Sequence, residues 1–285
     1  MNIGDFCREL FRRNKILASV ALANLILFFV LAFIAPFDSH VILGVNRWFK
    51  PMKFALSIAI YTGTLAWLLA YIAHRTWAMR VISWGVGVSM IVEIFCILLQ
   101  PARGTTSHFN TATGFDVAVF SLMGIMIIVN TLLAACAFIL FFTTTAPLPA
   151  AYLWGIRLGL GIFILAGIEG TFMLSRSSHS VGLHDGGPGL PFVNWSRGGG
   201  DLRIAHFMSL HALQLIPLAG FVLHRHSRKL PISDPTRWTF VFASVYVSLA
   251  TLLFLQAMMG RPLIPQAAAT NISQMISVLS KWHGI

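Results

Sequence analysis

The sequence contains seven apolar runs, each close to the length of one membrane crossing. A helix of about 20 apolar residues spans the ~30 Å hydrocarbon core of a bilayer. Composition agrees, because 57% of the residues are hydrophobic and 10% are charged, whereas soluble domains carry about 25% charged residues. We therefore predict an all-α integral membrane bundle of seven transmembrane helices. The expected spans are residues 15–36, 51–73, 80–100, 116–142, 152–174, 203–223 and 238–259.

The seven spans predict one transmembrane domain over residues 1–260. Residues 261–285 are only weakly amphipathic, so we expect a tail that lies on the surface or is loosely ordered. The first apolar run has no small-residue cleavage site before Pro36. We therefore expect this run to stay as a membrane anchor. The oligomeric state is left open.

Basic residues at the ends of the spans predict the orientation, because Lys and Arg are enriched in cytoplasmic loops. The N-terminal tail, the loop near 74–80 and the loop 224–237 are basic and fall on one side. We expect an N-terminus in the cytoplasm and a C-terminus outside, in a bacterial inner membrane. The net charge of +11 then reflects topology and lipid headgroups, and we expect no nucleic-acid partner.

The outer side also carries cations near the helix ends, and these need partners. Four acids on the same side can pair with them. The cations are Arg47, Lys50, Lys53, Arg103, Arg176, Arg197 and Arg203, and the acids are Asp38, Asp116, Asp185 and Asp201.

Polar residues gather in the outer third of the spans, whereas the inner half is apolar. Glu93, Glu169, His206, His211 and Gln214 lie in this layer. Ionisable residues inside a membrane are costly and indicate function by default, so the layer predicts a polar pocket that opens to the outside. The alternative is that the histidines reach to the interface and the glutamine bonds neighbouring helices.

Two outer loops are polar and rich in glycine, over residues 101–116 and 175–201. The second is longer than a connection requires, and long loops on a rigid scaffold often carry function. It can serve as a lid that carries His184 or Asp185 to the pocket, or it can be a surface cap.

Zinc is one cofactor that this residue set suggests. A catalytic zinc site uses three protein ligands and one water, and His108, His206 and His211 are the candidate ligands. His206 and His211 are five residues apart, which turns them away from each other on a regular helix, unlike the i, i+4 pair of known zinc motifs. The candidate acid–base residues are Glu93, Glu169 and Asp116.

Three other classes stay open. In a haem or quinone redox protein, His211 would be one axial ligand, with His206, His108 or His184 as the second. A proton-coupled carrier would use Glu93 and Glu169. The last class is a structural subunit.

An anionic ligand is suggested by the stretch WFKPMKF, which puts Lys50 and Lys53 at the outer start of the second span. Lys and Arg placed in this way can clamp a phosphate or a carboxylate. A lipid headgroup would reach them directly, and the alternative is simple anchoring at the interface. The complete candidate binding set is Lys50, Lys53, Arg103, Asn110, Arg203 and Gln214.

Three stretches carry a family resemblance: WFKPMKFALSIAIYTGTLAWLL, ARGTTSHFNTATGFD and HDGGPGLPFVNWSRGGGDLRIAHFMSLHALQLIPLAG. With their motifs KPxKF, RGxxSHFN and GGDLRxxHFxxLHALQ, residues 45–260 resemble a family of uncharacterised bacterial multi-pass membrane proteins. This resemblance implies a plan of about seven spans and no particular activity. The plan is also similar to that of the seven-span zinc hydrolases of the alkaline ceramidase and progestin-receptor type. That similarity implies zinc held by histidines and an aspartate, although the histidine spacing here differs.

Together these features predict a membrane protein with an outward-facing His/Glu/Arg pocket. We expect the pocket to bind an anionic, lipid-like amphipathic molecule or to perform metal-assisted chemistry on it.

Overall fold

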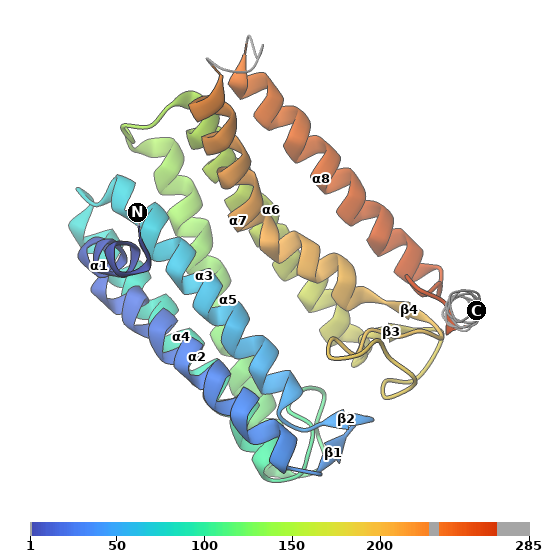
Figure 1. Cartoon of the computed structure of the whole chain (residues 1–285). Coiled ribbons are helices and arrows are strands. Elements are labelled where there is room, and N and C mark those ends of the chain that lie inside the picture. The colour runs from blue at the N-terminus through green and yellow to red at the C-terminus, as the bar shows by residue number, and fades with distance from the viewer. Residues whose placement is uncertain (1, 228–233, 267–285) are drawn as a thin grey trace, which may run out of the picture.

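The structure is a computed structural model, which describes residues 2–227 and 234–266. This part of the chain forms eight α-helices, two 3-10 turns and four short strands (Figure 1). The helices are α1 (Ile3–Arg13), α2 (Lys15–Ile34), α3 (Phe49–Leu69), α4 (Thr76–Ala102), α5 (Gly114–Thr143), α6 (Ala150–Arg176), α7 (Leu202–His226) and α8 (Pro235–Met258). The 3-10 turns, η1 (Ala35–Phe37) and η2 (Ala70–Ile72), extend α2 and α3.

Seven of these helices, α2 to α8, are long and apolar enough to cross a membrane. The expected all-α bundle with seven spans is therefore confirmed. The largest boundary difference is at the third span, which was expected from residue 80 and begins at Thr76. Of the expected C-terminal tail, residues 267–285 lie outside the described residues.

The spanning helices form two groups, α2 to α5 and α6 to α8 (Figure 1). Tyr61 of α3 lies where the groups meet. Its hydroxyl donates to Asn130 Oδ1 of α5 at 2.9 Å, and its ring stacks on Phe163 of α6 with centroids 5.0 Å apart. Fully buried apolar side chains, among them Leu17 and Phe141, fill the main core. Close packing of this kind holds the two groups together.

Small residues allow α6 and α7 to pack with their main chains in contact. A Cβ atom added at Gly220 of α7 would clash with the carbonyl oxygen of Ala151 on α6. Membrane helices lack the hydrophobic driving force that operates in water, so close backbone approach is a main source of their association.

The two ends of the bundle differ, and we name them the strand end and the α1 end. At the strand end β1 (Val41–Ile42) pairs with β2 (Val45–Asn46), and β3 (Ser180–Val181) pairs with β4 (Gly200–Asp201), both antiparallel. The second pair closes the long loop between α6 and α7 at its base. Gly200 is needed there, because a Cβ atom would clash with the carbonyl oxygen of Ala257.

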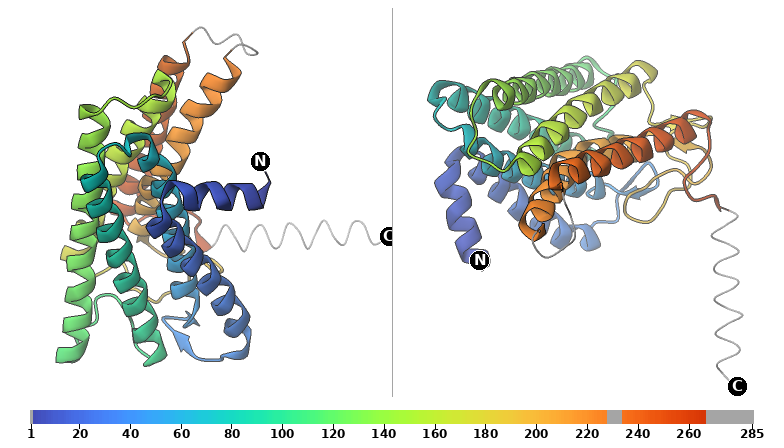
Figure 2. Two further views of the ribbon diagram at one scale, coloured as in Figure 1. Left: turned by 90° about the vertical axis from the view of Figure 1, so that its left-hand side faces the viewer. Right: turned by 90° about the horizontal axis from the view of Figure 1, so that it is seen from above.

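The basic segment before residue 15, treated as a tail in the sequence analysis, forms the helix α1. Asn2 caps it by accepting a hydrogen bond from the Asp5 amide at 2.8 Å, which is a usual helix start. Leu10 is buried, and the Phe6 ring stacks on Trp67 of α3 at 5.6 Å. The helix lies across the direction of the spanning helices (Figure 2). It thus has the form of an interfacial amphipathic helix.

Candidate functional site

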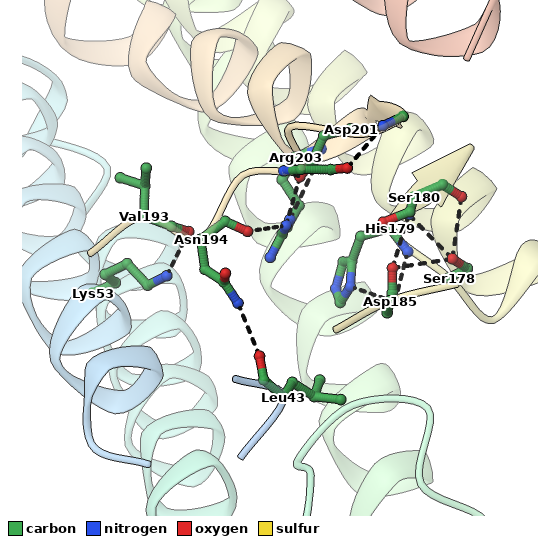
Figure 3. Close-up of polar contacts among 12 residues, drawn as sticks. Leu43, Lys53, Ser178, His179, Ser180, Asp185, Val193, Asn194, Asp201 and Arg203 are labelled. Carbon is green, nitrogen blue, oxygen red and sulfur yellow. Dashed lines mark hydrogen bonds and ion pairs between the residues drawn. The ribbon is translucent and has the colours of Figure 1, made fainter. Parts of the chain in front are cut away.

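A loop from the α6–α8 group reaches across to α3 at the strand end (Figure 3). We call residues 186–194 the crossing segment. The Lys53 ammonium of α3 donates to the Val193 carbonyl at 2.9 Å, and Asn194 Nδ2 donates to the Leu43 carbonyl at 3.4 Å. The rings of Phe49 and Phe192 lie 5.6 Å apart. The crossing segment therefore joins the two helix groups at this end.

A cavity of about 760 Å³ lies between the crossing segment and the β1–β2 turn. Its lining is mostly apolar side chains and glycine or proline backbone. The lining residues are Gly44, Val45, Asn46, Phe49, Gly186, Gly187, Pro188, Gly189, Leu190, Pro191, Phe192 and Asn194. The cavity is largely open, and its lining offers apolar surface to part of a small molecule.

Among the described residues, five other than glycine adopt left-handed backbone conformations, all in loops of the strand end. They are Leu43 (φ 50°), Phe109 (φ 57°), Ser177 (φ 50°), Phe192 (φ 62°) and Asn194 (φ 55°). Such a conformation costs about 1–2 kcal/mol for most residues and tends to persist at ligand clamps and switch regions. Two of the five, Phe192 and Asn194, lie in the crossing segment, which therefore holds part of the backbone strain at this end.

Three of the four expected acid pairs form at the strand end. Arg47 pairs with Asp38 at 2.6 Å and Arg103 pairs with Asp116 at 2.7 Å. Arg203 pairs with Asp201 through two nitrogens, and the Asp201 side chain is fully buried. These arginines are therefore compensated within the protein.

The fourth acid, Asp185, is held by the loop instead of by an expected cation. It accepts hydrogen bonds from the Ser180 amide at 3.0 Å and from the Ser178 hydroxyl at 3.2 Å, and His179 Nδ1 lies 3.0 Å away (Figure 3). Burial alone would raise the pKa of Asp185, but these hydrogen bonds outweigh it and hold the pKa well below its usual range. Asp185 thus fixes the start of the loop. Its negative charge also acts on Lys50.

The two lysines of α3 differ from the arginines. Within the described part of the chain, neither Lys50 nor Lys53 has a carboxylate at ion-pair distance; the hydrogen bond of Lys53 goes to a main-chain carbonyl. Lys50 is half-buried. It interacts electrostatically with Arg203, Lys53, Glu93 and Asp185. The structure therefore places Lys50, Lys53 and Arg203 near one another, and among the described residues only Arg203 of the three is paired with a carboxylate.

Glu93 of α4 is a buried acid whose charge acts on Lys50. Its Oε2 atom has no hydrogen-bond partner in the part of the chain that the structure describes. Of the three predicted acid–base residues, Glu93 is the one that acts on a lysine of the site.

His108 also joins the site, whereas His179 was missed by the sequence analysis. The His108 ring lies against Phe54 and Phe109 at 5.6 and 6.2 Å, and its centroid is 6.5 Å from that of His179. Burial, with Lys50 and His179 nearby, lowers the pKa of His108 well below its ordinary value. Burial also lowers the pKa of His179, although Asp185 opposes this.

The other two predicted metal ligands lie elsewhere. His206 Nδ1 is 3.9 Å from Glu169 Oε2 across the α6–α7 contact, and the His211 ring packs on Phe207 at 4.3 Å. Among residues 2–227 and 234–266, no three His, Cys, Asp or Glu side chains are grouped so as to hold a metal ion. The zinc hypothesis thus gains no ligand set from these residues, and the haem alternative stays a prediction.

The rest of the predicted binding set serves local structure. Arg103 and Asp116 bond each other, and Asp116 also accepts from Gln100 at 2.9 Å. Asn110 Nδ2 donates to Thr105 Oγ1 at 2.9 Å within the α4–α5 loop. These residues belong to a hydrogen-bond network that links the end of α4 to the start of α5.

Gln214 likewise lies apart from the lysines. Its Nε2 atom is 3.3 Å from Thr64 Oγ1 on α3, deeper in the bundle. This contact fits the alternative role of a hydrogen bond between helices.

Comparison of the chain with protein-family models, with curated proteins and with solved structures finds no match. The case for function therefore depends on the site itself.

Proposed function

We propose that this protein binds an anionic amphipathic molecule at its strand end. Lys50, Lys53 and Arg203 would hold the anionic group. The observation that supports this most strongly is the pair of lysines on α3, which have no carboxylate partner among the described residues. An uncompensated cation in a half-buried site is costly, and a bound phosphate or carboxylate would compensate it through charge-assisted hydrogen bonds.

The apolar part of the ligand would lie in the neighbouring cavity. Phe49, Leu190 and Phe192 contribute apolar surface to it. The lining residues Phe192 and Asn194 flank Val193, whose carbonyl accepts from Lys53, and the Asn194 carbonyl accepts from Arg203. The cavity therefore lies next to the contacts of these two cations with the crossing segment. A molecule with a charged head and an apolar body suits both parts, and Glu93 is the acid–base group that would lie close to its head.

We infer that the protein resides in a bacterial inner membrane with the strand end outside. The supporting observation is the charge bias, because basic residues favour the cytoplasmic side. Eleven Lys and Arg residues belong to the N-terminal 15 residues, to the loops 74–80 and 224–237 and to Arg157, against seven near the helix ends on the other side. With this orientation the lysines face headgroups of the outer leaflet.

A thermal-shift assay on the purified full-length protein tests the proposal. The probes are a short-chain phosphatidylglycerol and a phosphatidylcholine with the same chains. We expect only the anionic lipid to raise the Tm, by a few degrees at saturating concentration. The variant Lys50→Gln/Lys53→Gln should lose this shift, and Lys15→Gln, at an exposed lysine of the α1 end, should keep it.

Equal shifts with both lipids, or a full shift in the double variant, would show that the lysines do not hold an anionic headgroup. Native mass spectrometry of the same samples gives an independent measure of bound lipid. It therefore separates a loss of binding from a change in intrinsic stability.

A further inference from the structure

Two consecutive carbonyl oxygens of the crossing segment accept hydrogen bonds from two of the three cations of the site. The Val193 carbonyl accepts from Lys53 of α3 at 2.9 Å, and the Asn194 carbonyl accepts from Arg203 Nη2 of α7. Figure 3 shows the two cations approaching the segment from opposite sides. The tip of the segment thus presents two neighbouring oxygens to a cation pair, as a phosphate or carboxylate group would.

The three cations differ in their hydrogen-bond partners. Arg203 is paired with Asp201 through Nε at 2.9 Å and also through Nη2, the nitrogen that donates to the Asn194 carbonyl, so Arg203 stays compensated when the segment leaves. The hydrogen bond of Lys53 goes to the segment alone among the described residues. Lys50 donates to neither carbonyl, so it would be the third cation to hold the anion.

From this geometry we infer that the Val193 and Asn194 carbonyls take the places of two oxygens of the bound anion, so the crossing segment and the ligand compete for Lys53 and Arg203. This inference depends on the proposed function and extends it. The ligand class is an oxyanion that offers two oxygens, such as a phosphoryl group. The segment acts as a lid that the ligand displaces.

Few contacts hold the crossing segment on its α3 side, so a ligand could displace the segment from α3. That side holds it by the Lys53 bond, by the long bond from Asn194 to Leu43 at 3.4 Å, and by the Phe49–Phe192 ring contact. The left-handed conformations of Phe192 and Asn194 can relax when the tip is released. Few contacts and a strained tip are what a low-stability, movable element requires.

The opposite side of the segment is anchored within its own loop. Leu190 N donates to the Trp195 carbonyl at 2.8 Å and Arg197 N donates to the Pro188 carbonyl at 3.0 Å. The tip would therefore swing away from α3 while the base of the loop stays with α6 and α7.

Hydrogen–deuterium exchange of the full-length protein tests this inference. The readout is the exchange rate of the amides in residues 186–194, and the probes are short-chain phosphatidylglycerol, inorganic phosphate and, as a control, the matching phosphatidylcholine. We expect an anionic probe that binds to raise exchange in this segment roughly threefold or more. Lys53→Gln should raise it with no anion added, and Lys15→Gln should leave it unchanged.

The outcomes separate the inference from the function it rests on. If native mass spectrometry detects phosphatidylglycerol bound while exchange in the segment stays unchanged or slows, the competition is wrong and the proposed function stands. If neither anion binds, both fail. Faster exchange with inorganic phosphate as well as with the lipid supports displacement by the free oxyanion, and faster exchange with the lipid alone assigns the displacement to a lipid headgroup.

Discussion

Glu169 Oε2 of α6 and His206 Nδ1 of α7 face each other at 3.9 Å, and in the described structure neither atom has a hydrogen-bond partner. Buried polar atoms are nearly always bonded, so this pair is an exception inside the closest helix contact of the bundle. It lies apart from the lysine site and bears on stability rather than on the proposed ligand.

Replacing Glu169 with glutamine should change the free energy of unfolding by about 1 kcal/mol or less, which is the net contribution of one hydrogen bond. The reason is that the glutamine side-chain oxygen can keep the hydrogen bond from Ser209, and Oε2 has no hydrogen bond to lose. Denaturant unfolding in detergent measures this. A loss of about 3–5 kcal/mol would instead show that Glu169 and His206 form a true buried ion pair.

Acidification should destabilise the strand end through His108. Burial lowers its pKa in the folded protein, so the unfolded chain binds the proton more readily and stability falls as the pH drops below about 6.5, the ordinary value for histidine. We expect Tm to decrease from pH 7.5 to pH 5.5, and His108→Phe to reduce that decrease because phenylalanine fits the aromatic surroundings. The control is His184→Gln, at an exposed histidine. A profile of His108→Phe that coincides with wild type would contradict the assignment.

Asp201 should be among the most sensitive acids of the protein. Its side chain is 0% exposed and it bonds Arg203 and the Ser196 amide, so Asp201→Asn leaves a cation without its partner and should cost about 3–5 kcal/mol. The matched pair Asp5–Arg8 is exposed, at 46% and 81%, and Asp5→Asn should cost at most about 1 kcal/mol. Chemical unfolding of both variants compares them. Similar small effects would mean that Asp201 does not anchor the loop.

The close contact of α6 with α7 predicts a difference between two glycines. Gly220→Ala puts a methyl group against the Ala151 carbonyl and should destabilise by about 1–3 kcal/mol. Gly124→Ala on α5 meets no atom within 4 Å and should be neutral or stabilise by up to about 1 kcal/mol. Thermal unfolding of the two variants decides this, and equal Tm values would argue against close packing at Gly220.

The spans could be predicted because each must fill the thickness of a bilayer with apolar residues. The α1 helix could not be recognised by that rule, since it has only 11 residues and many charges. Its signal was the spacing of Ile3, Phe6 and Leu10 on one face after the capping Asn2. A search for amphipathic periodicity before residue 15 would have found it.

Part of the site followed from topology alone. Antiparallel spans bring the start of α3 and the start of α7 to one end, which placed Lys50, Lys53 and Arg203 together. The role of Val193 and Asn194 could not be foreseen, because every residue has a carbonyl and only the folded loop shows which ones point at the cations. Arg103 differs, because Asp116 was among the acids expected to pair with the outer cations, and this pair withdraws Arg103 from the site.

The contact between Lys53 and Val193 joins positions 140 residues apart, and this separation has a consequence for biosynthesis. The second span leaves the ribosome and enters the bilayer well before the loop that completes the site has been translated. During that interval the lysines have only water and headgroups as partners. Binding competence is thus acquired late, when the sixth span has been inserted, and a nascent chain interrupted earlier would carry the cations without the lid.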